Sequence, residues 1–111
     1  MQLLPALEGG GVERSTLEIA DALVAAGHRS LVVSAGGRLV AALEAGGSTH
    51  IARPIGRKGP GVLGEIGRLR ALIEQHRPDI VHARSRLPAW IARFALRGLR
   101  GPRPRWMTTV H

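Results

Sequence analysis

The sequence contains no cysteine, which excludes disulfide bonds and thiolate metal sites. Aromatic residues are almost absent, so the core must be aliphatic; the three are Trp90, Phe94 and Trp106. No apolar run approaches the roughly 18 residues of a membrane-spanning helix, and no basic segment precedes the N-terminal apolar stretch. The sequence therefore predicts neither a membrane span nor a signal peptide, and we expect a cytoplasmic protein.

The chain has 111 residues, of which 44% are hydrophobic, as in a single globular domain. Its charge is unevenly distributed. Residues 1–52 carry a net charge of −2, from three Arg and five acids, whereas residues 53–111 carry +10, from thirteen Lys or Arg and three acids. Such a basic half attracts polyanions, anionic lipid headgroups or phosphorylated ligands, although a general preference for Arg explains part of the excess.

Short apolar segments alternate with helical patterns along the whole chain. The predicted strands are 2–7, 30–34, 50–52, 78–83 and 106–110. The predicted helices are 13–26, 38–45, 62–76 and a fourth that has Pro88 in its first turn. This β-α order predicts an α/β fold of the Rossmann-like, three-layer α/β/α type, with a five-stranded parallel sheet in the order 3-2-1-4-5.

Three glycines, Gly9, Gly10 and Gly11, separate the first predicted strand from the first helix. A strand, a glycine turn and a helix N-terminus together bring free N–H groups close to an anion, usually a phosphate. The dinucleotide-binding fingerprint is incomplete, because Arg14 stands where its third glycine belongs. A tight turn without a ligand is the alternative interpretation.

A second polar segment, His82-Ala83-Arg84-Ser85, follows the fourth predicted strand. In the predicted strand order the first and fourth strands are neighbours, so this segment should face the glycine turn at the switch point of the sheet. Arg84 and Arg86 could bind a phosphate or another acid bidentately, or form a solvated basic loop. His82 could orient a hydroxyl group of a ligand, or pack against the neighbouring loop.

Four segments in this order, with this spacing, resemble the N-terminal domain of family 4 glycosyltransferases of the GT-B fold: Leu4–Arg14, Leu23–Ser34, Arg77–Arg86 and Thr108–His111. The resemblance implies one of two Rossmann-like domains that face each other across a cleft, this one holding mainly the acceptor. It implies that Gly10 and Gly11 approach the donor diphosphate and that His111 is a catalytic residue near the transferred sugar. It also implies that His82, Arg84 and Ser85 line the acceptor side.

The function implied by the resemblance is sugar transfer from a nucleotide-sugar donor to a glycan or lipid-linked acceptor by a retaining glycosyltransferase. We expect residues 1–111 to form its acceptor-side domain without the C-terminal donor-binding domain, and to be inactive alone. The alternative is a non-catalytic Rossmann-like module that binds a nucleotide or phosphate ligand. We expect no cofactor and no metal site, because His28, His50 and His76 lack metal-ligand spacing.

Basic residues are concentrated after position 92, and their partner has two interpretations. Many members of the family act on lipid-linked acceptors, and a basic surface suits anionic headgroups, so we expect peripheral contact with the inner face of a membrane. Nucleic acid is the alternative, but there is no helix-turn-helix pattern and almost no aromatic platform, so we do not expect nucleic-acid binding. The basic residues concerned are Arg93, Arg97, Arg100, Arg103 and Arg105.

The last strand should lack a covering helix and expose apolar sheet surface, which predicts aggregation or dimerisation.

Overall fold

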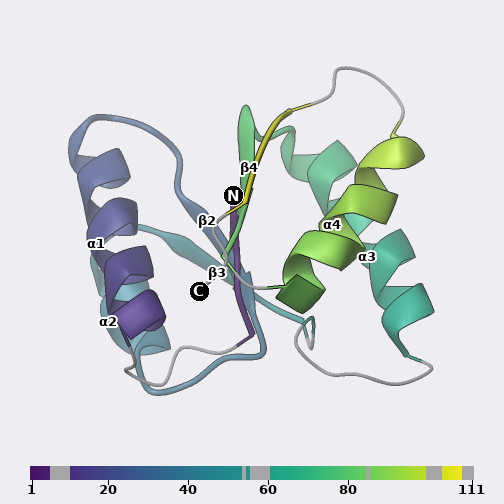
Figure 1. Ribbon diagram of the computed structural model, residues 1–111. Helices are drawn as coiled ribbons and strands as arrows, with labels where there is room; N and C mark the ends of the chain where they lie inside the picture. Colours follow the sequence, from purple (N-terminus) through teal and green to yellow (C-terminus); the bar gives the residue numbers. More distant parts are fainter. Residues whose placement is uncertain (6–10, 54, 56–60, 85, 100–103, 109–111) are drawn as a thin grey trace.

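The computed structural model describes residues 1–5, 11–53, 55, 61–84, 86–99 and 104–108. It contains one sheet with helices on either side (Figure 1). All strand pairs are parallel, and the strands lie in the order β3-β2-β1-β4-β5. The predicted Rossmann-like fold and its strand order are confirmed. The strands are β1 (Gln2–Leu3), β2 (Leu31–Ser34), β3 (Thr49–Ala52), β4 (Ile80–Ala83) and β5 (Arg105–Thr108).

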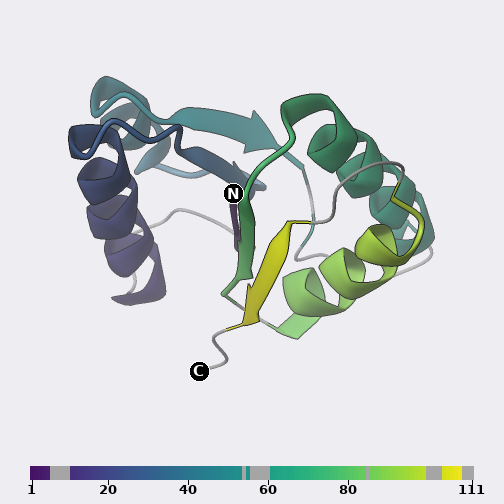
Figure 2. The same ribbon diagram turned by 90° about the horizontal axis from the view of Figure 1, so that it is seen from above.

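Helices cover both faces of the sheet, in two pairs. Helices α1 (Gly11–Ala25) and α2 (Val40–Ala45) lie on one face, and α3 (Val62–His76) and α4 (Arg86–Arg97) lie on the other (Figure 2). The connections from β1 to β2 and from β2 to β3 run toward one edge of the sheet. The connections from β3 to β4 and from β4 to β5 run toward the other edge. Right-handed crossovers then place the two pairs of helices on opposite faces.

Two hydrophobic clusters form the core, one on each side of the sheet, and their buried residues are all aliphatic. The larger cluster joins the sheet to α3 and α4 and contains Leu3, Val33, Ile55, Leu69, Ile73, Val81, Ala83, Ile91, Ala92 and Ala95. The smaller cluster joins the sheet to α1 and α2 and contains Leu4, Ala20, Val32 and Leu43. Leu3 and Leu4 belong to different clusters because successive side chains of a strand point to opposite faces.

The element boundaries differ from the predicted ones mainly at the ends of the chain. Strand β1 is shorter than the predicted strand 2–7, although the Leu4 amide still donates to the Val33 carbonyl, at 3.1 Å. Helix α1 ends close to the predicted residue, and Gly27 follows it in the left-handed conformation, with φ at 85°. The His28 amide donates to the Leu23 carbonyl and the Gly27 amide to the Val24 carbonyl, which is a Schellman cap.

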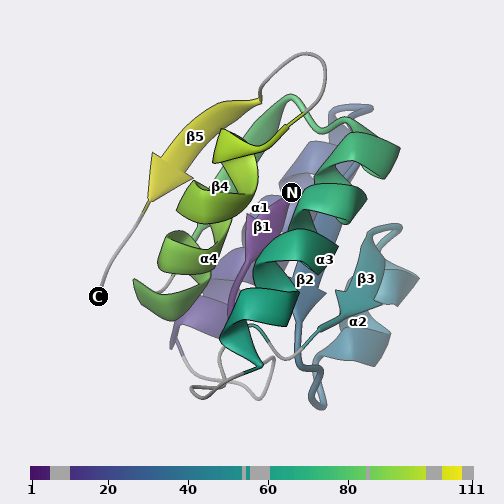
Figure 3. The same ribbon diagram turned by 90° about the vertical axis from the view of Figure 1, so that its right-hand side faces the viewer.

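Strand β5 forms one edge of the sheet (Figure 3), and it exposes apolar side chains. Trp106 is 38% exposed and Met107 is 48% exposed. Met107 lies in register with His82 and Gln2, so the three side chains are on the same face of the sheet. A groove of about 440 Å³ opens there, lined by residues that include Ile19, Ile80 and Met107. The expected exposure of apolar sheet surface is observed, and dimerisation through it stays a prediction.

Arg70 of α3 ties the C-terminal end of α4 to the neighbouring helix. Its Nε donates to the Ala95 carbonyl and its Nη2 to the Phe94 carbonyl, both at 3.0 Å. A positive charge is favourable there because the last carbonyl groups of a helix carry partial negative charge. Gly98 leaves the space for this contact, since a Cβ atom at position 98 would overlap the guanidinium group of Arg70.

We expect the substitution Arg70→Met to lower the free energy of unfolding by about 1–3 kcal/mol, because two hydrogen bonds from a charged donor are lost. Arg68→Met, on the same helix at an exposed position, should change it by no more than about 0.5 kcal/mol. Urea unfolding of both variants measures the difference. Equal effects of the two substitutions would show that the contacts of Arg70 with α4 contribute nothing.

Candidate functional site

The C-terminal ends of β1 and β4 lie next to each other at one rim of the sheet. The two strands pair in parallel, with Leu3 opposite Ala83, and the Arg84 amide donates to the Leu3 carbonyl at 2.9 Å. On the other side of β1, the Ala35 amide donates to the Pro5 carbonyl at 2.8 Å. The order of the strands changes direction here, and ligands of open α/β sheets bind at such a switch point.

Helix α1 begins at this rim with Gly11, whereas Gly10 lies outside the described residues. Gly11 is exposed, and no described atom lies within 4 Å of a Cβ atom built at this position. The residue also has no positive φ angle that would require glycine. Nothing among the described residues therefore requires a glycine at position 11, which stands at the N-terminus of α1, where backbone N–H groups favour anions.

Arg84, the first residue after β4, turns its side chain inward rather than toward solvent. It is 4% exposed, and it lies between the sheet and α1. Its Nη1 donates to Gln2 Oε1 at 3.3 Å, and its Nη2 donates to Ser15 Oγ at 2.7 Å. Burial lowers the pKa of the Arg84 guanidinium below its usual range.

His82 lies two residues before Arg84 in the sequence, so its side chain is on the same face of the sheet. It is half-buried and lines the groove that Ile19 of α1, Ile80 and Met107 also line. Burial lowers the pKa of His82, and the positive charges of Arg84 and the N-terminal amine lower it further. The structure thus brings His82 and Arg84 to one face but places His82 in this groove.

The remaining residues of the predicted site, Ser85 and His111, lie outside the described part of the chain. The structure adds residues that the sequence analysis did not single out. Gln2 and Ser15 both bond to Arg84, and Gln2 Nε2 also donates to the Thr16 carbonyl at 3.2 Å. Gln2 could have been singled out from the sequence, because it is a polar residue in an otherwise apolar predicted strand.

A second polar contact holds the same rim further along the sheet. Arg53, directly after β3, forms a bidentate ion pair with Glu65 in the first turn of α3, with Nε and Oε2 3.0 Å apart. The hydrogen bond to Glu65 raises the pKa of Arg53 above its usual range. This pair fixes the start of α3 to the end of β3, as Arg84 fixes α1 to the ends of β1 and β4.

Other kinds of site find no support in the part of the chain that the structure describes. Among the described residues, no three His, Cys, Asp or Glu side chains are grouped so that they could hold a metal ion. None of the described helices combines the length and the apolar character that crossing a membrane requires. The geometry is that of an α/β domain whose switch point combines a helix N-terminus, an open glycine position and a buried arginine.

Comparisons with known proteins agree with this class of fold. The family model described as Glycosyltransferase Family 4 matches residues 9–111. The chain therefore belongs to glycosyltransferase family 4. It is similar to the crystal structure of a glycosyltransferase from Rickettsia africae ESF-5, with 36% sequence identity and a TM-score of 0.81 over 96% of this chain. The chain spans 28% of the length of that protein. A search of curated proteins found no significant match.

Stability should fall as the pH is lowered from about 7.5 to 5.5, because burial lowers the pKa of His50 and of His82 in the folded state. The unfolded chain then binds protons at pH values where the folded chain does not. The α-amino group of Met1, whose pKa burial lowers to about 6, acts in the same direction. Urea unfolding at several pH values measures the slope.

Replacing both histidines by glutamine should reduce this pH dependence and leave the part that comes from Met1. A slope that the double substitution leaves unchanged would contradict the assignment to His50 and His82.

Proposed function

We propose that this chain is the acceptor-side domain of a retaining glycosyltransferase of the GT-B fold. The enzyme would transfer a sugar from a nucleotide-sugar donor to a glycan or a lipid-linked acceptor. The observation that supports this function most directly is the position of Gly11 and Arg84 at one switch point of a parallel sheet. Membership of the family favours it over a non-catalytic phosphate-binding module.

In this proposal Gly10 and Gly11 lie against the donor diphosphate, where the helix N-terminus favours negative charge. His111 lies near the transferred sugar, and His82 and Ser85 contact the acceptor. Most of the nucleotide would be held by a second domain, as the two-domain architecture implies. A transfer reaction needs preorganised groups on both reactants, so residues 1–111 alone should not turn over a nucleotide-sugar.

The substitution Gly11→Ala tests the diphosphate site, because the fold has room for the added methyl group. We expect unchanged or higher stability, by up to about 1 kcal/mol, since alanine favours the helix. Affinity for uridine, guanosine or adenosine diphosphate should fall, because the methyl group occupies the space of the ligand. Calorimetric titration with the three nucleotides measures the affinity.

Gly67→Ala is the matched control, since Gly67 is an exposed helix residue that also has no described atom within 4 Å of an added Cβ. It should leave nucleotide affinity unchanged. Wild-type affinity in Gly11→Ala would contradict close approach of the diphosphate to this residue.

The proposal includes a surface for a membrane, formed by exposed residues of α4 and β5 that we call the basic-aromatic face: Trp90, Arg93, Arg97, Arg105 and Trp106. Helix α4 and strand β5 contain no acidic residue, so nothing on these elements offsets their arginines. Both tryptophans of the chain belong to this face, and Trp90 is 54% exposed. Tryptophan and arginine together suit the headgroup region of an anionic bilayer.

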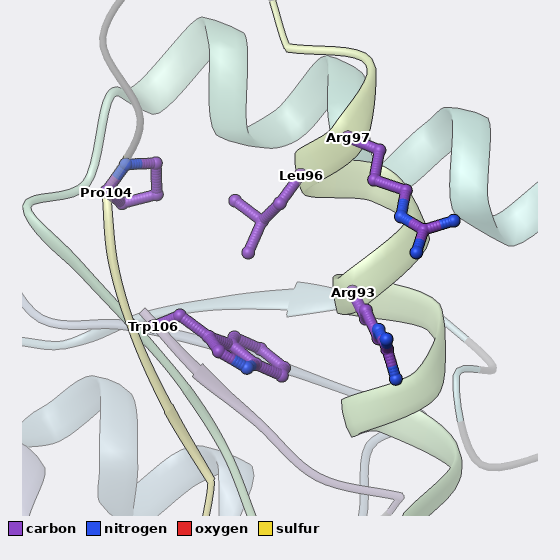
Figure 4. A pocket seen from close by; sticks show the side chains of 5 residues that line it. All are labelled: Arg93, Leu96, Arg97, Pro104 and Trp106. Carbon is purple, nitrogen blue, oxygen red and sulfur yellow. The ribbon is translucent and has the colours of Figure 1, made fainter.

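The side chains of this face are held by contacts within α4. The ring of Trp90 packs edge-on against Phe94, with centroids 4.7 Å apart, and the guanidinium of Arg97 lies 5.2 Å from the Phe94 centroid. Between α4 and β5 a pocket of about 420 Å³ is lined by Arg93, Leu96, Arg97, Pro104 and Trp106. Leu96 and Trp106 point into it, while both arginines extend from the helix (Figure 4). An apolar pocket beside two cations fits an anionic amphiphile.

We expect the chain to bind vesicles that contain about a third of phosphatidylglycerol and not vesicles of pure phosphatidylcholine, with a blue shift of tryptophan fluorescence. The double substitution Arg93→Gln and Arg97→Gln should weaken binding about tenfold or more, since each basic residue contributes about 1 kcal/mol at such a surface. Co-sedimentation with vesicles measures the partition.

Arg68→Gln with Arg77→Gln removes the same charge from exposed positions of α3 and its C-terminal cap and serves as the control. Equal losses in both double variants would mean that net charge alone attracts the chain. Tighter binding to random duplex DNA than to anionic vesicles would favour a nucleic-acid partner instead.

A further inference from the structure

Arg84 carries a buried positive charge that no carboxylate neutralises within the described part of the chain. Among the described residues, its hydrogen-bond partners are Gln2 and Ser15, which are both neutral, and its Nε has no partner. Among the described residues, no acidic oxygen lies within 4 Å of the guanidinium group. Burying a charge against neutral groups is costly, and burial correspondingly disfavours protonation of this side chain.

The position of the charge adds to this cost. Ser15 belongs to the second turn of α1, so the guanidinium lies beside the N-terminal half of that helix. A helix N-terminus carries partial positive charge, and a cation beside it is unfavourable. Glu13 in the first turn is the nearest acid in the sequence of α1 but forms no ion pair with Arg84. The charge of the Arg84 guanidinium and the partial positive charge of the α1 N-terminus thus lie near the same rim.

The hydrogen bonds of Arg84 connect three elements at the switch point. Its backbone amide donates to β1 at Leu3, and its side chain reaches Gln2 of the same strand and Ser15 of α1. Gln2 extends the connection to the Thr16 carbonyl. The first two turns of α1 are therefore held by a side chain that begins at the end of β4, and the direction of the helix N-terminus depends on it.

We infer that Arg84 is a positioning residue for anion binding at the rim and does not itself contact the acceptor. It fixes the first turns of α1 against β1 and β4, and it supplies a permanent positive charge behind the helix N-terminus. A diphosphate bound in front of Gly11 would offset the charge that the free protein leaves uncompensated. This inference rests on the proposed function and assigns Arg84 a role different from direct contact with the acceptor.

Burial distinguishes this role from that of an exposed arginine. Mobile ions screen a solvent-exposed charge over about 10 Å at 0.1 M salt but screen a buried charge much less. The contribution of Arg84 to anion affinity should therefore persist at high salt. Arg14, which is exposed on the first turn of α1, provides a matched charge that salt can screen.

The experiment titrates the 111-residue chain with inorganic pyrophosphate at 0.05 M and 0.5 M KCl, in wild type and in the variants R84M, R84K and R14M. We expect R84M to weaken pyrophosphate binding about tenfold at both salt concentrations, because a buried charge is lost. R84K keeps the charge and should recover part of the affinity. R14M should weaken binding at low salt only.

Amide hydrogen exchange provides a readout that does not depend on the ligand. In R84M the amides of residues 15–18, which follow the free N–H groups of the first turn of α1, should exchange at least several-fold faster, whereas those of residues 19–25 should keep their rates. Unchanged exchange at residues 15–18 would overturn the positioning role. Unchanged pyrophosphate affinity in R84M, with faster exchange, would leave Arg84 a purely structural residue and overturn the inference as well.

Failure of the proposed function gives a different result. If the wild-type chain binds no pyrophosphate while R84M accelerates exchange at residues 15–18, the diphosphate site is wrong, and the part of the inference that concerns anions is wrong with it. Only the role of Arg84 in fixing the first turns of α1 is then supported. If R84M loses affinity for a glycan acceptor but not for pyrophosphate, direct contact with the acceptor is the correct role.

Discussion

Parallel pairing of β1 on both of its edges is the constraint on which the rest of the structure depends. Gln2 and Leu3 face Val32 and Val33 on one side and His82 and Ala83 on the other. Because β1 is central, the chain must reverse its direction across the sheet after β3, and this reversal places two helices on each face. The same reversal brings the ends of β1 and β4 together and so creates the rim where the candidate site lies.

The order of the elements could be predicted because it depends on local patterns. The apolar run within residues 30–34 predicted a strand buried on both faces, and all four residues of β2 are buried. The apolar period from Val62 to His76 predicted the bounds of α3 correctly. The length of β1 could not be predicted, since Leu4 and Pro5 are as apolar as a strand requires. Their pairing depends on where the neighbouring strands end.

The direction of the Arg84 side chain also could not be predicted from the sequence. A basic residue between Ala83 and Ser85 is typical of an exposed loop, and only the tertiary partners Gln2 and Ser15 turn it inward. The site is consequently divided into two parts. Gly11 offers open space at the surface, whereas Arg84 and its partners form a buried frame behind it. Sequence patterns indicate the first part more readily than the second.

Some arginines of this basic chain donate hydrogen bonds to the carbonyl groups at the C-terminal ends of helices. Arg29 donates to the last carbonyl group of α3, at His76, and Arg70 donates to the last carbonyl groups of α4. A guanidinium group has several donors in one plane, so it can serve two carbonyl oxygens at once, which an ammonium group does less well. Arginines engaged in this way are directed at the backbone. The positive field that an approaching polyanion meets is therefore weaker, and more confined to the remaining arginines, than a count of charges suggests.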